Sequence, residues 1–211
     1  CLYAVLARQG YFPKDEILTL RKVGSRLQGH PDKAFLPILE TTSGSLGQGL
    51  SISNGIALAA KLDRLDIRVY CLLGDGELDE GQIWEAAMTS SHYKLDNVCA
   101  IVDYNKFQID GSVKEVKNLE PLVKKWKAFN WHAIEIDGHN FKEIMDAYDE
   151  LDRIEGKPTI IIAHTIKGKG VSFMENNLDW HGVAPKREHL DKALKELETE
   201  EKALKSEYDR I

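Results

Sequence analysis

Four short apolar runs, rich in the residue types that favour strands, occur in the chain after residue 68. They cover residues 69–73, 98–102, 132–138 and 158–164. Between these runs, apolar residues recur at helical spacing instead. Strands that alternate with helices in this way predict an α/β fold, with a doubly wound, mostly parallel sheet flanked by helices.

The helices are predicted from spacing and from their boundary residues. They are expected near residues 1–10, 13–21, 50–60, 77–88, 114–127, 141–154 and 186–208. The helix over 141–154 is amphipathic, with Phe141, Ile144, Met145, Tyr148 and Leu151 on one side. The last helix is highly charged with a sparse leucine stripe, which indicates a peripheral helix rather than a binding surface.

The segment from residue 69 to residue 105 has the pattern strand, turn, helix, strand. Its first strand stops at Gly74–Gly76, and its second ends at Asp103–Asn105. A right-handed crossover places the ends of both strands on the same edge of the sheet, where open α/β sheets bind ligands. Asp75 and Asn105, which lie 30 positions apart, are therefore expected to converge.

An acidic carboxylate and an amide oxygen are hard ligands that suit Mg²⁺, which commonly shares its shell with phosphate oxygens. Gly76 has no side chain, so a phosphate oxygen can approach the backbone N–H groups beside it. The pair Asp75 and Asn105 thus indicates a metal-bridged diphosphate. A tight strand-to-helix connection is the alternative interpretation of the Gly-Asp-Gly turn alone.

Length and composition narrow the class of protein. The chain has 211 residues, 43% of them hydrophobic, and is most simply one domain. Its net charge of −6, without a basic block, excludes nucleic acid as an expected partner, and no apolar run is long enough to span a membrane. No signal peptide is evident, and Cys71 and Cys99 fall within predicted strands, so buried thiols and a cytoplasmic location are expected.

The Gly-Asp-Gly motif followed by Asn105 resembles the fingerprint of thiamine diphosphate enzymes. The sequence of the motif is most similar to that of the transketolase family. Three further motifs share the resemblance, in the same order along the chain. They are Gly29–Pro31 (GHP), Gly44–Gly49 (GSLGQG), and Thr165–Gly170 (TIKGKG) followed by Trp180–Gly182 (WHG). The resemblance therefore covers nearly the whole chain.

The resemblance implies a metal site and a cofactor site. Asp75, the side chain of Asn105 and the carbonyl of Phe107 would bind Mg²⁺, for which Ca²⁺ or Mn²⁺ could substitute. Phe107 stands where the family usually has an aliphatic residue, which a backbone ligand tolerates. Gly76 and Asn105 would hold the diphosphate, and Ile109 would pack near the thiazolium.

The other motifs imply contacts to the rest of the cofactor and to substrate. Gly44, Ser45 and Leu46 would contact the aminopyrimidine and thiazolium through backbone groups, although such glycines also serve tight turning and helix packing. Lys167 and His181 would reach the diphosphate, and His181 would also face substrate. A flexible surface loop is the alternative for the basic segment.

His30 and two acids complete the set that the resemblance implies. His30 would line the substrate channel, although a lone loop histidine is commonly just solvated. Glu80 and Glu85 resemble the acidic pair that links active sites across a dimer interface, with ordinary solvent-facing helix acids as the alternative.

The resemblance also implies a domain organisation. Residues 1–211 would form the diphosphate-binding domain, truncated at the N-terminus, because Cys1–Ala7 already has the pattern of a helix interior. A preceding segment with an SKGH-like motif, and the pyrimidine-binding domain with its glutamate, are not found in this chain. We therefore expect the N-terminal subunit of a split transketolase, with a C-terminal partner subunit, homodimeric pairing within a heterotetramer, and sugar phosphates as substrates.

Three alternatives stay open at the level of sequence. The chain could be a non-catalytic, cofactor-binding assembly partner or fragment. It could belong to another thiamine diphosphate enzyme, such as 1-deoxyxylulose-phosphate synthase or a dehydrogenase E1 component, although GHP, GSLGQG and WHG favour ketose transfer. A nucleotide-binding Rossmann protein fits least, because Gly-Asp-Gly replaces the GxGxxG motif. The sugar donor and acceptor are not specified by these motifs.

Overall fold

The computed structural model describes residues 1–208 and divides into two compact units. The first unit comprises residues 1–48, and the second begins at Gly49 and contains the sheet. The two units differ in content, because the first has only short helical elements and the second has all the strands.

The first unit is built from α1 (Leu2–Arg8), the 3₁₀ helix η1 (Lys14–Thr19) and connecting loops. Its small apolar core consists of Ala7, Phe12, Leu27, Leu36 and Leu39. The predicted helix over 13–21 is thus confirmed in its position but is a 3₁₀ helix.

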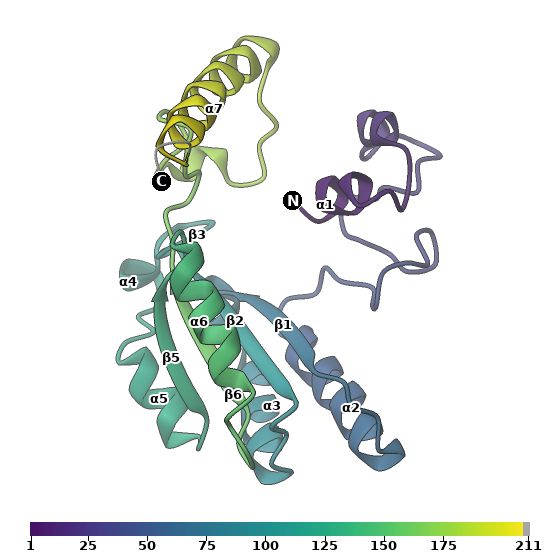
Figure 1. The fold of residues 1–211 in the computed structure, drawn as a ribbon, viewed down its shortest axis with the longest axis vertical. Helices are drawn as coiled ribbons and strands as arrows, with labels where there is room; N and C mark the ends of the chain where they lie inside the picture. The colour runs from purple at the N-terminus through teal and green to yellow at the C-terminus, as the bar shows by residue number, and fades with distance from the viewer. Residues whose placement is uncertain (209–211) are drawn as a thin grey trace. The chain divides into compact units, whose positions relative to one another are not determined.

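The second unit contains a four-stranded, fully parallel sheet in the order β1-β2-β6-β5 (Figure 1). The strands are β1 (Val69–Gly74), β2 (Val98–Tyr104), β5 (His132–Asp137) and β6 (Thr159–His164). The central strand β6 is buried over its first five residues, as expected for a parallel strand covered on both faces. The predicted α/β fold with a mostly parallel sheet is therefore confirmed.

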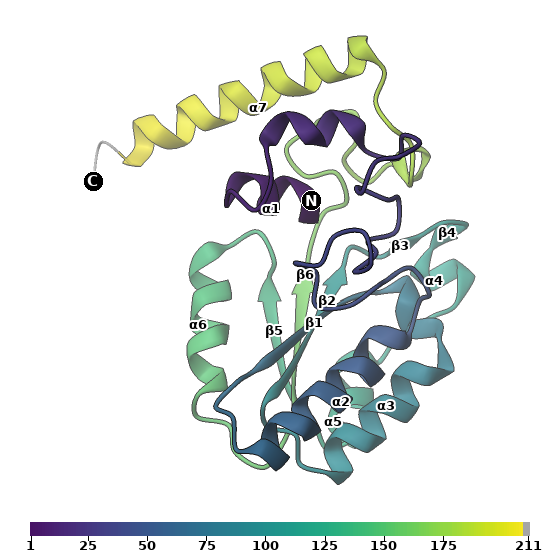
Figure 2. The ribbon, with the colours of Figure 1, turned by 90° about the vertical axis from the view of Figure 1, so that its right-hand side faces the viewer.

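Helices lie on both faces of this sheet (Figure 2). One face is covered by α2 (Gln48–Asp63), α3 (Gly81–His92) and α5 (Leu122–Ala128), and the opposite face carries α6 (Phe141–Leu151). Ile83 and Trp126 contribute fully buried side chains to the core beneath the first face. The sheet is doubly wound, as predicted.

The segment between β2 and β5 differs from the prediction. A single helix over 114–127 was expected, but the structure has the short helix α4 (Val113–Val116) and then α5, separated by residues 117–121. Pro121 precedes α5, because proline has no N–H to continue a helix but is tolerated at its start. An unpredicted hairpin of β3 (Phe107–Gln108) and β4 (Gly111–Ser112) follows β2.

The apolar side of α6 is only partly buried. Leu151 is buried, Ile144 and Tyr148 are half-buried, but Phe141 is 82% exposed and Met145 57% exposed. Phe141 is the first residue of the helix, and Met145 lies one turn after it. The predicted amphipathic helix is thus confirmed, and its apolar side is buried only in part.

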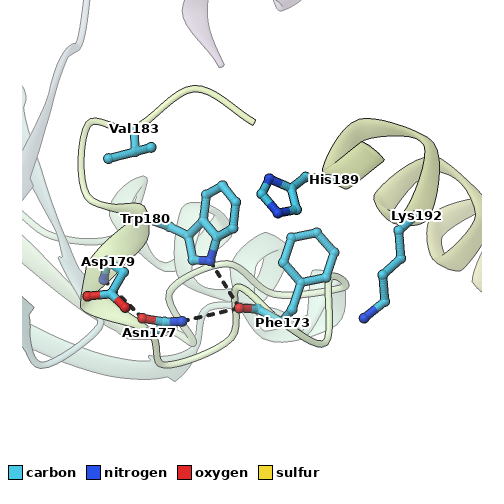
Figure 3. A pocket seen from close by; sticks show the side chains of 7 residues that line it. All are labelled: Phe173, Asn177, Asp179, Trp180, Val183, His189 and Lys192. Carbon is cyan, nitrogen blue, oxygen red and sulfur yellow. Dashed lines mark hydrogen bonds between the residues drawn. The ribbon is translucent and has the colours of Figure 1, made fainter. Parts of the chain in front are cut away.

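After β6 the chain forms the 3₁₀ helix η3 (Leu178–Trp180) and then the last helix, α7 (Arg187–Tyr208). The rings of Phe173, Trp180 and His189 meet there around a cavity of about 500 Å³ (Figure 3). Ser172 donates from its N–H and its hydroxyl to the Glu196 carboxylate, at 2.7 and 2.9 Å. The predicted peripheral helix thus anchors the segment that leads out of the sheet.

The cysteines of the strands behave as expected. Cys71 and Cys99 are both buried and unpaired, and burial raises the pKa of Cys71 and raises that of Cys99 to about 12. Both thiols are therefore protonated and unreactive at neutral pH. Among residues 1–208, no helix is both long and apolar enough to cross a membrane.

Candidate functional site

Asp75 lies at the carboxyl end of β1 and is only 2% exposed. One carboxylate oxygen accepts the Gly76 N–H at 2.7 Å, and the other accepts the Lys106 N–H at 2.5 Å. Lys106 directly follows Asn105, so the ends of β1 and β2 meet as the crossover predicted. The carboxylate is held by backbone groups from two separate strand ends.

The environment of Asp75 opposes its negative charge. Burial above all, together with the nearby charge of Asp103, raises the pKa of this carboxyl to about 6, although the hydrogen bonds from Lys106 and Gly76 act in the opposite direction. A buried carboxylate with two oxygens turned to one sheet edge is a suitable ligand for a hard divalent cation. The cation would compensate the charge that burial disfavours.

The Gly76 position leaves no room for a side chain. A Cβ built there would lie 2.8 Å from the Cβ of Gln108. The Gln108 amide in turn donates to one oxygen of Asp79 at 3.3 Å, whereas the other Asp79 oxygen is buried without a hydrogen-bond partner among the described residues. Excess acceptor capacity around the Gly-Asp-Gly turn is consistent with a bound cation.

The other two predicted metal ligands lie directly after β2. The Asn105 side-chain oxygen accepts the Phe107 N–H at 3.0 Å, so the loop folds back on itself and keeps both residues at the sheet edge. No group of three or more His, Cys, Asp or Glu side chains within residues 1–208 is arranged to hold a metal. The predicted set contains only one such side chain, and its carboxylate, amide and carbonyl oxygens suit Mg²⁺ rather than a softer metal.

A cavity of about 460 Å³ at this edge brings predicted residues together. Asn105, Lys167 and Gly168 line it, so the amide after β2 and the basic loop after β6 share one space. The cavity wall also contains Asp103 and Thr165, and the Thr165 hydroxyl donates to the Asp103 carboxylate. The basic loop is thus tied to the end of β2.

A second, larger cavity of about 780 Å³ adjoins the first and shares Asn105, Thr165 and Ile166 with it. Its wall contains Tyr104, whose hydroxyl donates to the Glu120 carboxylate at 2.7 Å. Burial and this carboxylate both raise the pKa of Tyr104, so the phenol stays protonated.

Other predicted residues of the second unit lie outside both cavity walls. His181 is exposed and directly follows η3, and Ile109 is 69% exposed in the turn of the β3–β4 hairpin. Glu80 and Glu85 are exposed on or beside α3, close to Met88, which is 54% exposed. These residues are open to a ligand or a partner, and their predicted roles stay predictions.

The predicted residues of the first unit form a separate local arrangement. The His30 ring packs against Gly44, where a Cβ would lie 2.9 Å from the ring, and Gly44 has a φ of +136°. Glycine tolerates this φ and this approach, whereas another residue would be strained. Ser45 accepts a hydrogen bond from Gln48 at 3.0 Å, and Leu46 is 57% exposed. The structure therefore brings together the GHP and GSLGQG motifs.

Sequence reasoning missed several residues of the sheet edge. Asp103, Thr165 and His139 line the smaller cavity, and Lys106 supplies the N–H that holds Asp75. Asp103, Thr165 and His139 each directly follow the last residue of a predicted strand, and Lys106 directly follows the predicted ligand Asn105. That position is the signal that could have identified them.

Comparison with known proteins identifies the family. The family model described as "Transketolase, thiamine diphosphate binding domain" matches residues 1–206. The chain belongs to the transketolase family. The predicted family and the predicted type of enzyme, a transketolase, are thereby confirmed.

Among similar transketolases, three are named as subunits, of which two are described here. The chain is 48% identical to the 6-deoxy-6-sulfo-D-fructose transketolase subunit SqwG of Clostridium sp. (strain MSTE9), over 94% of this chain and 72% of the relative. It is 42% identical to one subunit of the apulose-4-phosphate transketolase of Phocaeicola vulgatus, over 93% of this chain and 69% of the relative. The chain therefore corresponds to the transketolase subunit that carries the thiamine diphosphate-binding domain.

Full-length transketolases match over a smaller share of their length. Human transketolase is 41% identical over 93% of this chain, which spans 31% of the human protein. The crystal structure of transketolase from Campylobacter jejuni superimposes with a TM-score of 0.82 at 33% identity, over 87% of this chain and 30% of that one. The chain thus spans about a third of a full-length transketolase and has its thiamine diphosphate-binding fold.

Proposed function

We propose that this chain transfers a two-carbon ketol unit from a ketose phosphate to an aldose phosphate, together with a C-terminal partner subunit, thiamine diphosphate and Mg²⁺. The observation that carries the proposal is the meeting of three strand ends at one edge of the sheet. Asp75, Asn105 and Lys167 come from these ends, and they supply a buried carboxylate, an amide and a cation.

The residues at the sheet edge would divide the binding of metal and diphosphate between them. Asp75, the Asn105 side chain and the Phe107 carbonyl would hold Mg²⁺, or Ca²⁺ or Mn²⁺ in its place. Lys167 would neutralise diphosphate charge. Gly76 would hold the diphosphate through its backbone, since Gln108 lies too close for any side chain at that position.

When bound, thiamine diphosphate supplies the electron sink for ketol transfer. This chain would contribute His30 and His181, whose imidazoles can donate hydrogen bonds to sugar hydroxyls or accept them. The backbone groups of Gly44, Ser45 and Leu46 would orient the cofactor rings, and Ile109 would pack near the thiazolium. The glutamate that the family uses to activate the cofactor would come from the partner.

The partner is proposed to carry the pyrimidine-binding domain. Two of the relatives are named as transketolase subunits, which supports an enzyme divided between chains. The exposed acids Glu80 and Glu85 would lie at an interface between two copies of this chain, which gives homodimeric pairing within a heterotetramer. A cytoplasmic enzyme of pentose phosphate metabolism is the setting that we propose.

The sugar substrate is proposed to be a ketose with an anionic terminal group. Two of the relatives are named for 6-deoxy-6-sulfo-D-fructose and apulose 4-phosphate, which carry a sulfonate and a phosphate. A donor panel of xylulose 5-phosphate, 6-deoxy-6-sulfo-D-fructose and apulose 4-phosphate therefore includes both kinds of anionic terminal group.

The test is a ketol-transfer assay with each donor, an aldose phosphate acceptor, Mg²⁺ and thiamine diphosphate. The chain is assayed alone and with the proposed C-terminal subunit. Turnover only in the mixture supports a split transketolase. Cofactor binding without turnover for any donor favours the assembly-partner alternative, and consumption of pyruvate without ketose transfer favours another thiamine diphosphate enzyme.

A further inference from the structure

The basic loop after β6 is held in place at several points of its backbone. The Thr165 hydroxyl donates to Asp103, and the Ile166 N–H donates to Nε2 of His139 at 2.8 Å. Beyond these, the Asn176 N–H donates to the Lys167 carbonyl at 2.9 Å. The Lys167 carbonyl is therefore held by Asn176, and the N–H of the residue before Lys167 is held by a histidine.

The position of His139 follows from the pairing of β5 with β6. In this parallel pair Asp137 lies opposite His164, and the Gly138 N–H donates to the His164 carbonyl at 2.9 Å. A Cβ at Gly138 would lie 2.5 Å from the Thr165 Cγ2, so the turn lies directly against the start of the basic loop. The His139 N–H in turn donates to the Asp137 carboxylate at 2.9 Å.

The α6 side of the turn is equally well defined. Asn140 caps α6 by accepting the N–H groups of Lys142 and Glu143, and a Glu143 oxygen accepts the Asp137 N–H at 2.8 Å. The backbone on either side of His139 is thus held by the strand and by the helix. The imidazole consequently projects from a rigid turn into the wall of the smaller cavity, where Lys167 also lies.

The contact with Ile166 defines the chemical state of the ring. A backbone N–H can only donate, so Nε2 must present its lone pair and the proton of the neutral imidazole must reside on Nδ1. A glutamine at this position offers a carbonyl oxygen at a similar reach. An alanine offers no acceptor, and water would have to replace the contact.

We propose that His139 is a positioning residue, whose Nε2 fixes the Ile166 backbone and thereby orients Lys167 in the cavity. This inference rests on the proposed function, in which Lys167 binds the cofactor diphosphate. His139 itself would touch neither metal nor cofactor. Its effect would pass through the 165–167 backbone.

The test compares His139→Ala and His139→Gln with wild type. His92→Ala is the matched control, because His92 is an exposed histidine on α3 whose ring meets that of the neighbouring Tyr93 edge-on. Amide hydrogen exchange of Ile166 is measured on the chain without ligand, and long-range ¹H–¹⁵N spectra report which imidazole nitrogen carries the proton. Binding of inorganic diphosphate with Mg²⁺ is measured by calorimetry on the same samples.

We expect Nε2 of His139 to be unprotonated in wild type. The Ile166 amide should exchange about three- to tenfold faster in His139→Ala, a factor that corresponds to the free energy of one hydrogen bond. Diphosphate affinity should fall by a similar factor in His139→Ala. Both the exchange rate and the affinity should return to wild-type values in His139→Gln and stay unchanged in His92→Ala. A protonated Nε2, or unchanged Ile166 exchange in His139→Ala, overturns the inference. Loss of Ile166 protection in His139→Ala, while wild type binds no diphosphate, supports the contact with Ile166 but refutes the proposed cofactor site.

Discussion

The carboxyl edge of the sheet and the loop over residues 29–49 both carry predicted cofactor contacts, but they are held in different ways. At the sheet edge, Asp75 is 2% exposed and is bonded to backbone groups from two strand ends. In the loop, His30, Gly44 and Ser45 are exposed, and their order depends on local contacts such as the packing of the His30 ring on Gly44.

This difference indicates how the site is organised. Residues at the ends of buried parallel strands are fixed by the core, so metal and diphosphate binding would be preorganised within this chain. Exposed loop residues would be fixed in position only by the bound cofactor and the partner subunit. We therefore expect changes at the sheet edge to affect Mg²⁺ and diphosphate binding, and changes in the loop to affect turnover of the assembled enzyme.

The largest effect is expected for Asp75→Asn. The substitution removes the charge that would pair with Mg²⁺ and faces a new amide N–H toward backbone donors, so the affinity for Mg²⁺ and thiamine diphosphate should fall about a hundredfold or more. Calorimetry on the assembled enzyme measures this affinity. Asp149→Asn, on the exposed surface of α6, is the control. Equal affinities for wild type and Asp75→Asn would remove the metal site from this sheet edge.

Acidic pH should weaken the same site. Because the pKa of Asp75 is raised to about 6, affinity for Mg²⁺ should fall about tenfold for each pH unit below that value. The metal-free protein should show the opposite trend in stability. The folded state binds the proton more tightly than the unfolded state, so the free energy of unfolding falls by about 2 to 3 kcal/mol as pH rises from about 4 to 6.

Denaturant titrations at several pH values, without and with Mg²⁺, test this dependence. Asp75→Asn should lose this part of the pH profile, because asparagine does not titrate. If the free energy of unfolding of Asp75→Asn depends on pH as it does in wild type, the titrating group is not Asp75.

Lys167→Ala compared with Lys169→Ala distinguishes the two lysines of the basic loop. Lys167 lines the smaller cavity, whereas Lys169 lies 3.8 Å from the Glu175 carboxylate. Removal of Lys167 should weaken diphosphate binding about tenfold, the value of one charge-assisted hydrogen bond, with about twofold or less for Lys169. Equal losses in both variants would indicate only a general electrostatic attraction.

The smallest effect on diphosphate binding is expected for Gly44→Ala in the loop. Alanine at a φ of +136° is strained and would displace the His30 ring, so turnover of the assembled enzyme should fall several-fold while diphosphate affinity stays unchanged. Gly55→Ala in α2 has open space around it and should be neutral or stabilising by about 0.5 to 1 kcal/mol. A loss of diphosphate binding in Gly44→Ala would erase the distinction between the two regions.

Much of the sheet could be predicted, because its signals are local. The apolar runs that became β1, β2, β5 and β6 end in turns at the positions expected, and a right-handed crossover is enough to bring Asp75 to the end of β2. The break at Pro121 also has a local signal, which the helical spacing on either side obscured.

The remaining parts of the site depend on contacts between distant segments. His139 and Ile166 lie 27 positions apart, and they meet only because β5 pairs with β6. The strand order β1-β2-β6-β5 is a property of packing that no single segment encodes. The exposure of Phe141 is likewise not specified by helical periodicity, which gives the apolar side of a helix but not what packs against it.

The most direct measurement is anomalous diffraction from crystals of this chain with its C-terminal subunit, grown with Mn²⁺ and thiamine diphosphate. We expect one Mn²⁺ peak at the sheet edge, within ligand distance of the Asp75 carboxylate, the Asn105 side-chain oxygen and the Phe107 carbonyl, with the Lys167 ammonium against the diphosphate. A Mn²⁺ peak elsewhere, or a diphosphate bound without Asp75 and Lys167, would contradict it.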